Sequence, residues 1–462
     1  MQDTLTLEKI DHVAGSVNLI GSKSLTNRAL LLSALGTGTT RLTNILRSDD
    51  SEVMLSALQT LGVKVTLDSN DDTVVTVEGM GGVFNNADAG VVELFLGNAG
   101  TAMRPLAAAL ALSDGTYRLT GEPRMYERPI GILVDALRAL GAKIEYLGNE
   151  GYPPLLITGV KAVQRTAGGE GSSHVCASGA GAGSGSSVCE LEVAGNTSSQ
   201  FISALLMVSA LLDRPVHLKV KGELISRPYV HLTIELLKRF GIEVVNNCFE
   251  SFDIAPQKLI NPASYLVEGD ASGATYFLAA AAISGEVTVK GVGRDSIQGD
   301  TRFIEVLERM GANIEVGEDF LRVSKAPVLH GIDIDMNDMP DAAMTLVPMA
   351  LFTDSPVVIR NIESWRVKET DRIAAMAAEM RKLGCKVEEG QDYIMVDGSD
   401  PQCASLRESG DVPAFDTYND HRMAMCMSLA ALDRKIVIND PGCCRKTFPD
   451  YFTRFAQVSV RK

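Results

Sequence analysis

Hydrophobic and polar positions follow two alternating patterns along this chain of 462 residues. One recurring stretch begins with a turn of small residues, continues as a helix rich in Ala, Leu and Met, and ends in a short β-branched strand. A second stretch has apolar residues at i, i+3, i+4 and i+7, which is typical of a helix with one buried face. A glycine then follows, as at many helix C-termini, before paired strands. The pattern therefore predicts repeated units of helices and strands.

The first stretch occurs six times. Its copies begin at Gly21, Gly97, Gly195, Gly269, Met339 and Tyr418. The starts lie roughly 75 residues apart, except that 98 residues separate Gly97 from Gly195. The second stretch includes LVDALRALGAKIEYL and FIEVLERMGANIEV, and the late PDYFTRFAQV reads as a truncated copy. We expect an α/β (α+β) fold of six related units.

The long interval contains residues 161–189, which are rich in Gly, Ser and Ala and poor in bulky side chains. Such a composition cannot form a packed core, so we expect a flexible surface insertion. His174, Cys176 and Cys189 in this segment raise the alternative of a metal or redox clip. The composition favours the simpler interpretation, solvated loop residues.

The composition excludes several classes of partner. A net charge of −15 argues against nucleic acid or an anionic membrane as the main partner. No apolar run approaches the ~18 residues that a membrane span needs, and the polar start resembles neither a secretory signal nor a transit peptide. Eight cysteines without a regular framework favour free thiols, and the dispersed histidines give little support for a metal. We expect a cytoplasmic protein that uses no metal or other cofactor.

The turns that open the six helices contain residues suited to binding anions. A helix N-terminus presents unpaired N–H groups and the positive end of the helix dipole. A single turn of this kind is more often an ordinary cap than a phosphate site. Six equivalent turns, most with a cation nearby, favour anion binding. Their polar residues are Ser22, Lys23, Ser24 and Arg28; Asn98, Gly100, Thr101 and Arg104; Ser198, Ser199 and Gln200; Asp270; Asp341; and Asp420, His421 and Arg422.

Three further loops concentrate basic residues in this acidic protein: GEPRMYERPIG at 121–131, SWRVKETDR at 364–372 and CCRKTFPD at 443–450. The second loop alone would suit a surface helix, with Lys368 and Arg372 separated by one turn and acidic neighbours between them. The loops occur at comparable points of the repeats, however, which indicates a substrate with several negative charges. The P-loop, dinucleotide-binding and nucleophile-elbow motifs are absent.

Together these motifs resemble one known family. GSKSLTNRALLL, LFLGNAGTAMRPL, GEPRMYERPIG, SSQF, PDAAMT, RVKETDR, YNDHRMAM and KTFPDYF are similar, in order, to motifs of the 5-enolpyruvylshikimate-3-phosphate synthase (3-phosphoshikimate 1-carboxyvinyltransferase) family of enolpyruvyl transferases. The resemblance covers residues 5–458 apart from the insertion. It implies six βαβαββ-like units, three in each of two domains, with the active site in the interdomain cleft and closure on substrate binding. The expected domains are 1–21 plus 268–462, and 22–267.

The resemblance also implies a reaction. Family members transfer the enolpyruvyl group of phosphoenolpyruvate to the 5-hydroxyl of shikimate 3-phosphate and release phosphate, in the shikimate pathway of aromatic amino-acid biosynthesis. Addition and then elimination proceed through a tetrahedral ketal intermediate, and no metal or other cofactor takes part. With Gly100 and Pro105 intact, the chain resembles the type that glyphosate inhibits. The family expectation is a monomer.

The resemblance assigns roles by motif position. Asp341 would accept the 5-hydroxyl proton, and Lys23 and Glu369 would exchange the proton at C3 of phosphoenolpyruvate. The residues implied to bind shikimate 3-phosphate are Ser24, Arg28, Ser198, Ser199, Gln200, Ser226, Asp341, Ser364 and Lys368. Those implied to bind phosphoenolpyruvate are Lys23, Gly100, Arg128, Gln200, Arg372, Arg422 and Lys446. We expect Asp371 to cap or orient its neighbours and Trp365 to contribute packing.

Some positions depart from the family pattern, and two other interpretations compete. Ile20 stands where Pro is usual, Ser364 where Asn is usual, and Tyr126 where Lys is frequent. A UDP-N-acetylglucosamine enolpyruvyl transferase would carry a Cys in the loop at 121–128, and this chain has none. A non-catalytic scaffold for phosphorylated ligands would have no reason to place Asp341 and Glu369 among its cations.

Overall fold

A computed structural model of the chain describes residues 3–166, 188–408 and 410–461. The chain divides into two compact units, which we call unit 1 (Met1–Ser22 with Glu268–Lys462) and unit 2 (Lys23–Val267). The expected insertion falls largely on residues 167–187, which lie outside the described residues; residues 161–166 belong to a helix. Within the described ranges, no helix is both long and apolar enough to cross a membrane.

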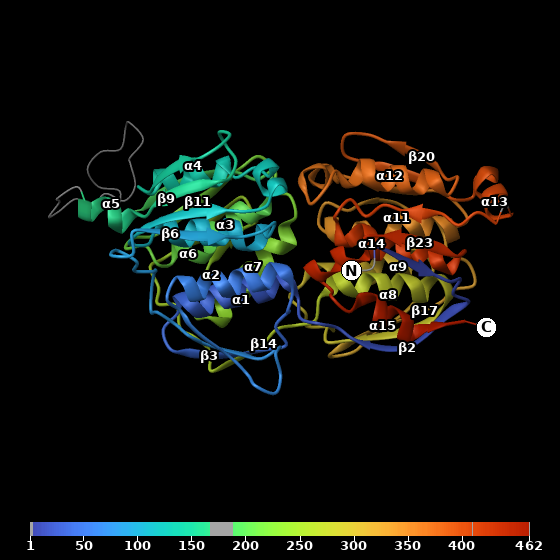
Figure 1. Cartoon of the computed structure of the whole chain (residues 1–462), viewed down its shortest axis with the longest axis horizontal. Coiled ribbons are helices and arrows are strands. Elements are labelled where there is room, and N and C mark those ends of the chain that lie inside the picture. The colour runs from blue at the N-terminus through green and yellow to red at the C-terminus, as the bar shows by residue number, and fades with distance from the viewer. Residues whose placement is uncertain (1–2, 167–187, 409, 462) are drawn as a thin grey trace. The chain divides into compact units, whose positions relative to one another are not determined.

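Six small sheets, three in each unit, form the framework of the described chain (Figure 1). Five of them share one plan: a parallel pair, then an antiparallel strand, then its hairpin partner. This repetition confirms the mixed helix–strand fold of six related units. The repeated plan follows from the repeated sequence, because each unit presents one apolar sheet face and one apolar helix face that must pack together.

Unit 2, in the described part of the chain, combines three four-stranded sheets with the helices that connect their strands. The sheets are β14 (Ser264–Leu266), β3 (Thr39–Thr43), β5 (Val75–Glu78) and β4 (Lys64–Leu67); β6 (Val91–Phe95), β7 (Thr116–Thr120), β9 (Leu155–Thr158) and β8 (Lys143–Tyr146); and β10 (Cys189–Ala194), β11 (Val216–Lys221), β13 (Ser251–Ile254) and β12 (Val245–Asn247). The helices are α1 (Lys23–Leu35), α2 (Asp49–Thr60), α3 (Gly100–Ala111), α4 (Gly131–Ala139), α5 (Val160–Thr166), α6 (Ser199–Ser209) and α7 (Arg227–Arg239).

Unit 1 has the same kinds of element. Its sheets are β16 (Asn313–Val316), β17 (Phe320–Ser324), β15 (Gly285–Lys290), β2 (His12–Asn18) and β24 (Ser459–Val460); β18 (Asp333–Asp335), β19 (Val357–Arg360), β21 (Ile394–Asp397) and β20 (Lys386–Glu389); and β1 (Thr4–Leu7), β23 (Ile436–Asn439) and β22 (Ala414–Phe415). Its helices are α8 (Ala271–Ser284), α9 (Phe303–Arg309), α10 (Pro340–Ala343), α11 (Leu346–Met349), α12 (Arg372–Lys382), α13 (Pro401–Glu408), α14 (His421–Met427) and α15 (Tyr451–Val458).

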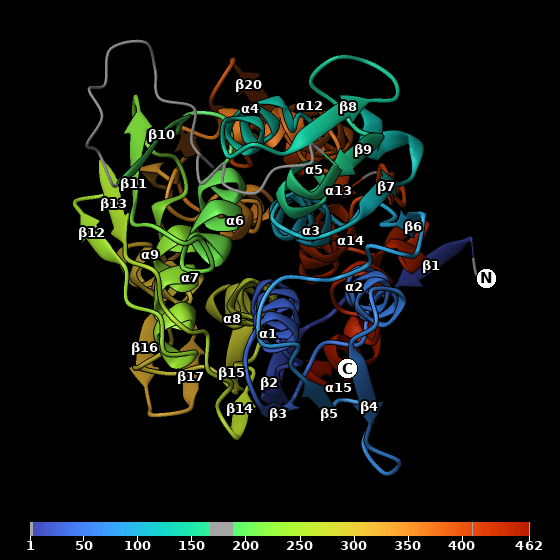
Figure 2. The same cartoon turned by 90° about the vertical axis from the view of Figure 1, so that its left-hand side faces the viewer.

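Two strands are exchanged where the chain passes between the units. β2 precedes α1 in sequence but pairs in parallel with β15, the strand after α8. Conversely, β14 precedes α8 but pairs in parallel with β3, the strand after α1, and lies beside it in Figure 2. Each exchanged strand therefore completes a sheet whose other strands come from a distant repeat. The third sheet of unit 1 is short because the last repeat is truncated. Its antiparallel strand is β1, from the start of the chain, which occupies the position that a hairpin strand has in the other five sheets.

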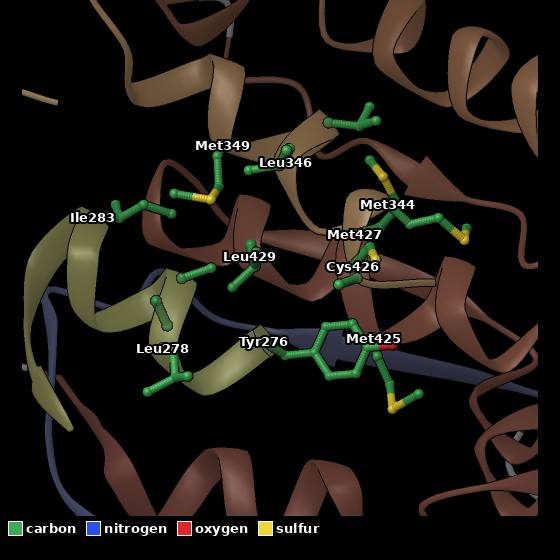
Figure 3. Close-up of a cluster of buried hydrophobic side chains, with 14 of the residues drawn as sticks. Tyr276, Leu278, Ile283, Met344, Leu346, Met349, Met425, Cys426, Met427 and Leu429 are labelled. Carbon is green, nitrogen blue, oxygen red and sulfur yellow. The ribbon is translucent and has the colours of Figure 1, made fainter. Parts of the chain in front are cut away.

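The central helix of unit 1 is buried on every side. α8 carries Ala, Phe and Leu around its whole circumference, which is the composition of a helix surrounded by protein. Leu278 and Ile283 of α8 belong to the same buried hydrophobic cluster as Met349 of α11 and Met427 of α14 (Figure 3). This packing fixes the helix starts that carry the polar residues of the site.

Among the cysteines that the structure describes, six are free, as expected, but one is not. Cys248, Cys385, Cys403, Cys426, Cys443 and Cys444 are free, whereas Cys189 forms a disulfide. The expectation of free thiols throughout was therefore wrong at Cys189.

Candidate active site

Arg372, the first residue of α12, lies at the centre of a charge cluster in unit 1. Its side chain is 1% exposed. Its Nε lies 2.8 Å from Asp420 Oδ2, its Nη1 2.9 Å from Asp341 Oδ1 and its Nη2 2.9 Å from Glu369 Oε2. Burial alone would lower the pKa of Arg372, but these carboxylates more than compensate and raise it. The planar guanidinium holds the three carboxylates through three different nitrogens, whereas a lysine would have to hold them through one.

Helix starts hold this cluster in place. Asp371 caps α12 by accepting the N–H of Ala374 at 3.2 Å and also pairs with Arg366 Nη1 at 2.7 Å. The capping role expected for Asp371 is thus confirmed. Asp420 caps α14 by accepting the N–H of Arg422 at 2.9 Å. Its carboxylate therefore joins two helix starts, because it also contacts the arginine that opens α12.

Trp365 supports the same region by packing. It is fully buried in the 3₁₀ turn Glu363–Val367, and its Nε1 donates to the Pro340 carbonyl oxygen at 2.7 Å. That bond holds the start of α10, where Asp341 lies in the first turn. The expectation of a packing role for the tryptophan is confirmed. Ser364 in the same turn is half-buried.

Asp341 is surrounded by three cations. Arg422 Nη2 lies 3.0 Å from its Oδ2, while Arg372 and the more distant Lys368, with Nζ at 3.9 Å, face its Oδ1. Burial by itself would raise the pKa of Asp341, but the cations, above all Arg422, hold it well below its usual range. The carboxylate is therefore ionised, and the groups around it can also bind anions.

Glu369 lies between an arginine and a lysine. Its Oε2 accepts from Arg372 Nη2 at 2.9 Å, and its Oε1 lies 3.2 Å from Lys446 Nζ. The side chain is nearly buried, so both ion pairs are shielded from water and are stronger than surface pairs. A carboxylate held against an ammonium in this way is suited to proton transfer.

Two residues of this region were not predicted from the sequence. The hydroxyl oxygen of Tyr276, on α8, accepts a hydrogen bond from Arg422 Nη1 at 3.2 Å. Asp300 is buried and accepts a hydrogen bond from the Ser272 hydroxyl. Burial, with a smaller contribution from the charge of Asp341, raises the pKa of Asp300 to about 6. The sequence did not indicate Tyr276 as a site residue, because it lies inside an apolar helix. It did not indicate Asp300 either, because the residues around Asp300 form no basic loop.

In unit 2, the starts of α1, α2 and α3 converge. Lys23 Nζ, at the first position of α1, lies 3.3 Å from Asp50 Oδ2 in the first turn of α2. Asn27 Nδ2 donates to Thr101 Oγ1 of α3 at 2.8 Å and to the Asp50 carbonyl oxygen at 3.4 Å. Three helix N-termini and one ammonium group therefore lie together.

Arg128 lies against the start of α3. Its Nη1 donates to both the carbonyl and the side-chain oxygen of Asn98, each at 2.9 Å. α3 begins at Gly100 after Ala99, which supplies no side-chain cap. A Cβ at Gly100 would lie 2.8 Å from Arg128 Nη2 and 2.7 Å from Arg104 Nη1. The absence of a side chain thus lets two guanidinium groups approach the helix start, an arrangement suited to an anion.

Arg28 joins α1 to α7 in the interior of unit 2. Its Nε donates to Thr233 Oγ1 at 2.9 Å and its Nη1 to the Ser24 carbonyl oxygen at 3.0 Å. Burial lowers the pKa of Arg28 to about 10, so it remains a cation at neutral pH. Thr233 also contacts Ser203 of α6 at 3.2 Å. α6 starts after Ser198, whose side chain accepts the N–H of Gln200 at 3.3 Å, and α7 starts after Ser226.

Apart from Ser364, which lies in the 3₁₀ turn before Lys368, the predicted residues fall into two groups. Unit 1 brings six of them into one connected cluster: Asp341, Lys368, Glu369, Arg372, Arg422 and Lys446. Those in unit 2 lie at or near the starts of its helices: Lys23, Ser24, Arg28, Gly100, Arg128, Ser198, Ser199, Gln200 and Ser226. Within the residues that the structure describes, no three or more His, Cys, Asp or Glu side chains form a group that could hold a metal ion.

Known proteins match this chain over its whole length. The family model described as EPSP synthase (3-phosphoshikimate 1-carboxyvinyltransferase) matches residues 7–455. A curated 3-phosphoshikimate 1-carboxyvinyltransferase of Vibrio atlanticus is 53% identical over 461 residues, covering 99% of this chain and 100% of the relative. The enzyme of the same name from Shewanella loihica is 54% identical over 458 residues, covering 98% and 99% of the two chains.

Solved structures agree on the fold. An EPSP synthase from Acinetobacter baumannii superposes with a TM-score of 0.74 at 23% identity, covering 99% of this chain and 98% of that one. The enolpyruvyl transferase NikO from Streptomyces tendae gives 0.72 at 15% identity, with 99% and 97% covered. At these identities the superpositions show the fold alone. The family assignment rests on the family model and on the relatives that are more than half identical. The chain belongs to the EPSP synthase (3-phosphoshikimate 1-carboxyvinyltransferase) family.

Proposed function

We propose that this protein transfers the enolpyruvyl group of phosphoenolpyruvate to the 5-hydroxyl of shikimate 3-phosphate and releases phosphate. The carrying observation is the cluster of unit 1, in which Asp341 and Glu369 are each held by cations within hydrogen-bonding distance. In a site that only bound anions, the cations would raise the affinity for the ligand and these two carboxylates would lower it. A reaction that moves protons between polyanionic reactants requires both.

Asp341 is assigned as the acceptor of the 5-hydroxyl proton. In the structure its pKa is held low by Arg422, Lys368 and Arg372, which makes the carboxylate a weak base. Phosphate and carboxylate groups bound by those cations would offset part of this effect. The pKa of Asp341 would then rise toward its ordinary value when the substrates bind, and the base would strengthen when it is needed.

Glu369 and Lys23 are assigned to the proton at C3 of phosphoenolpyruvate. Addition of a proton to C3 makes C2 electrophilic, the 5-hydroxyl oxygen attacks C2, and a tetrahedral ketal forms. Loss of a proton from C3 and of phosphate from C2 then gives the enolpyruvyl ether. Lys446, at 3.2 Å from Glu369, stabilises the carboxylate form, and Lys23 is held by Asp50.

The remaining cations are assigned to the anionic groups of the substrates. Arg128, Arg372, Arg422 and Lys446, with the start of α3 at Gly100 and with Gln200, would bind phosphoenolpyruvate. Arg28 and Lys368, with Ser24, Ser198, Ser199, Gln200, Ser226 and Ser364, would bind shikimate 3-phosphate. Hydroxyl groups at helix starts complement the cations, since they donate to phosphate oxygens without adding charge.

The decisive test is phosphate release on mixing both substrates with the purified protein, without added metal. Release should require shikimate 3-phosphate as well as phosphoenolpyruvate, with one enolpyruvyl ether formed per phosphate. Phosphate released from phosphoenolpyruvate alone would indicate a phosphatase and contradict the proposal, as would the absence of any product.

Glyphosate should inhibit the reaction in competition with phosphoenolpyruvate. Like phosphoenolpyruvate it carries a carboxylate and a phosphorus oxyanion, and Gly100 and Pro105 of α3 are both present. At a fixed concentration of shikimate 3-phosphate, the apparent KM for phosphoenolpyruvate should rise with glyphosate while kcat stays constant. Inhibition that does not depend on the phosphoenolpyruvate concentration would contradict this prediction.

Replacing Gly100 with Ala should weaken phosphoenolpyruvate binding. The added methyl group would lie 2.8 Å from Arg128 Nη2, so the guanidinium must move away from the helix start. We expect the KM for phosphoenolpyruvate to rise roughly tenfold, equivalent to about 1.4 kcal/mol. The KM for shikimate 3-phosphate serves as the internal control and should change little. Equal changes in both constants would point to general damage instead.

Two further assignments rest on the family and on the composition, respectively. We expect a monomer, which sedimentation equilibrium can test, and a cytoplasmic location, which fractionation of the source cells can test. The six free thiols among the described residues support a reducing compartment, whereas the disulfide at Cys189 argues against one.

A further inference from the structure

Two buried thiols face each other in unit 1, apart from the residues assigned to the reaction. Cys385 follows the end of α12, and Cys403 lies in α13. Their Sγ atoms are 3.8 Å apart, and the two residues are 6% and 0% exposed. None of the roles assigned above uses either residue.

We propose that Cys385 and Cys403 are a redox modification site: a peroxide converts the two thiols to a disulfide that fastens α13 to the end of α12. The proposal goes beyond the enolpyruvyl transfer and does not depend on it. An S–S bond is about 2.0 Å long, so the two sulfur atoms must approach by roughly 2 Å.

The backbone around the pair allows this approach. Gly384, with φ +79°, packs so closely on α13 that a Cβ there would lie 3.0 Å from the Gln402 carbonyl oxygen. The segments before the two cysteines are therefore already in contact. Cys403 is the only buried residue of α13, so few apolar contacts resist a small shift of this helix. Arg407 anchors its far end, with Nη2 2.9 Å from the Leu351 carbonyl oxygen.

The surroundings favour Cys403 as the attacking sulfur. A hydrogen bond from Cys385 lowers the pKa of Cys403 to about 7; burial opposes this effect, while Arg407 and Arg434 add to it. The same pairing raises the pKa of Cys385. The pairing therefore favours the thiolate at Cys403 and the thiol at Cys385, the arrangement in which a thiolate attacks and its neighbour resolves the product.

The chemistry balances with hydrogen peroxide as the oxidant. The Cys403 thiolate attacks one peroxide oxygen, the O–O bond breaks, and the departing hydroxide takes a proton to become water. The Cys385 sulfur then attacks the sulfenic sulfur, the S–O bond breaks, and hydroxide leaves as a second water with the Cys385 proton. Two thiols lose two electrons and two protons, and one peroxide becomes two waters.

The test uses the reduced full-length chain, treated with hydrogen peroxide and digested under conditions that block free thiols. Mass spectrometry should find the peptide of Cys385 joined to that of Cys403, lighter by two hydrogen atoms, and a dithiol reductant should separate them. Oxidation should raise the Tm on the order of 5 °C, because the bond closes the segment that contains β20 and β21. Enolpyruvyl transfer should be unchanged, since neither cysteine belongs to the charge cluster.

Three variants make the outcome decisive. Cys385→Ser and Cys403→Ser should each abolish the linked peptide and make the oxidative rise in Tm smaller than in the unaltered chain, where the disulfide of Cys189 can also re-form. Cys248→Ser, which removes an exposed thiol of unit 2, should leave both intact. If a serine variant fails to fold, the presence or absence of the linked peptide in the unaltered chain still tests the proposal. Oxidation of Cys403 to sulfinic acid with Cys385 unmodified, or a Cys443–Cys444 disulfide formed first, would overturn the proposal.

Discussion

Replacing Glu369 with Gln is expected to lower kcat by about 10²–10⁴-fold, the usual contribution of a positioned proton-transfer group. Glutamine has nearly the same shape, and its oxygen can still accept a hydrogen bond from Arg372 or Lys446. It has no carboxylate to take a proton from C3 or return one. The dissociation constants of both substrates should therefore change much less than kcat.

The measurement is the initial rate of phosphate release, together with calorimetric binding of shikimate 3-phosphate. Glu363→Gln is a matched control, because Glu363 is an exposed glutamate in the neighbouring 3₁₀ turn and accepts a hydrogen bond from the surface Gln391 at 3.2 Å. That variant should keep full activity. Similar turnover in Glu369→Gln and the unaltered chain would remove Glu369 from the mechanism.

Replacing Arg372 with Met is expected to lower the free energy of unfolding of unit 1 by about 3–5 kcal/mol, because it leaves buried charge without its partner. Asp420 is affected most: it is fully buried, and Arg372 supplies two of its hydrogen bonds, at 2.8 and 3.4 Å. Activity should also be lost, since the same guanidinium is assigned to phosphoenolpyruvate.

Trp365 provides the measurement, because it is the chain's only tryptophan and lies buried in unit 1. Urea unfolding followed by its fluorescence therefore reports on the unit that carries the mutation. Arg381→Met removes an exposed arginine from the same helix, paired with Glu389 at 3.0 Å, and should cost no more than about 1 kcal/mol. Equal decreases in the free energy of unfolding of the two variants would show that the buried position of Arg372 adds little to its effect on stability.

The difference between Arg372→Met and the unaltered chain should depend on pH. The pKa of Asp341 is depressed in the folded state, so the stability it contributes is present above its unfolded pKa and is lost as the pH falls through its folded pKa. Because Arg372 is one of the cations that depress this pKa, the two unfolding free energies should begin to converge as the pH falls below about 4, and should continue to converge as it approaches the folded pKa. A constant difference from pH 7 to pH 3 would argue against a charge effect.

Local patterns in the sequence were sufficient to predict the repeats and most of the charged helix starts that the structure groups together. Helix periods, terminal glycines and polar first turns are properties of neighbouring residues, and they located the starts of α1, α3, α6 and α14. The basic loops stood out because the protein is otherwise acidic. The family motifs then supplied roles for Asp341 and Glu369 that spacing alone could not.

Tertiary structure decided the rest, because it depends on contacts between residues that are far apart in the chain. The exchange of β2 and β14 between repeats leaves no local trace, since either strand would suit either sheet. The sequence determined which helix starts carry charge. It did not show that Asp420 accepts a hydrogen bond from Arg372, or that the Tyr276 hydroxyl accepts one from Arg422. A buried charge is costly unless it is paired, so these groups need partners inside the folded unit. The partners are 48 and 146 positions apart in the sequence, and only tertiary packing brings them within hydrogen-bonding distance.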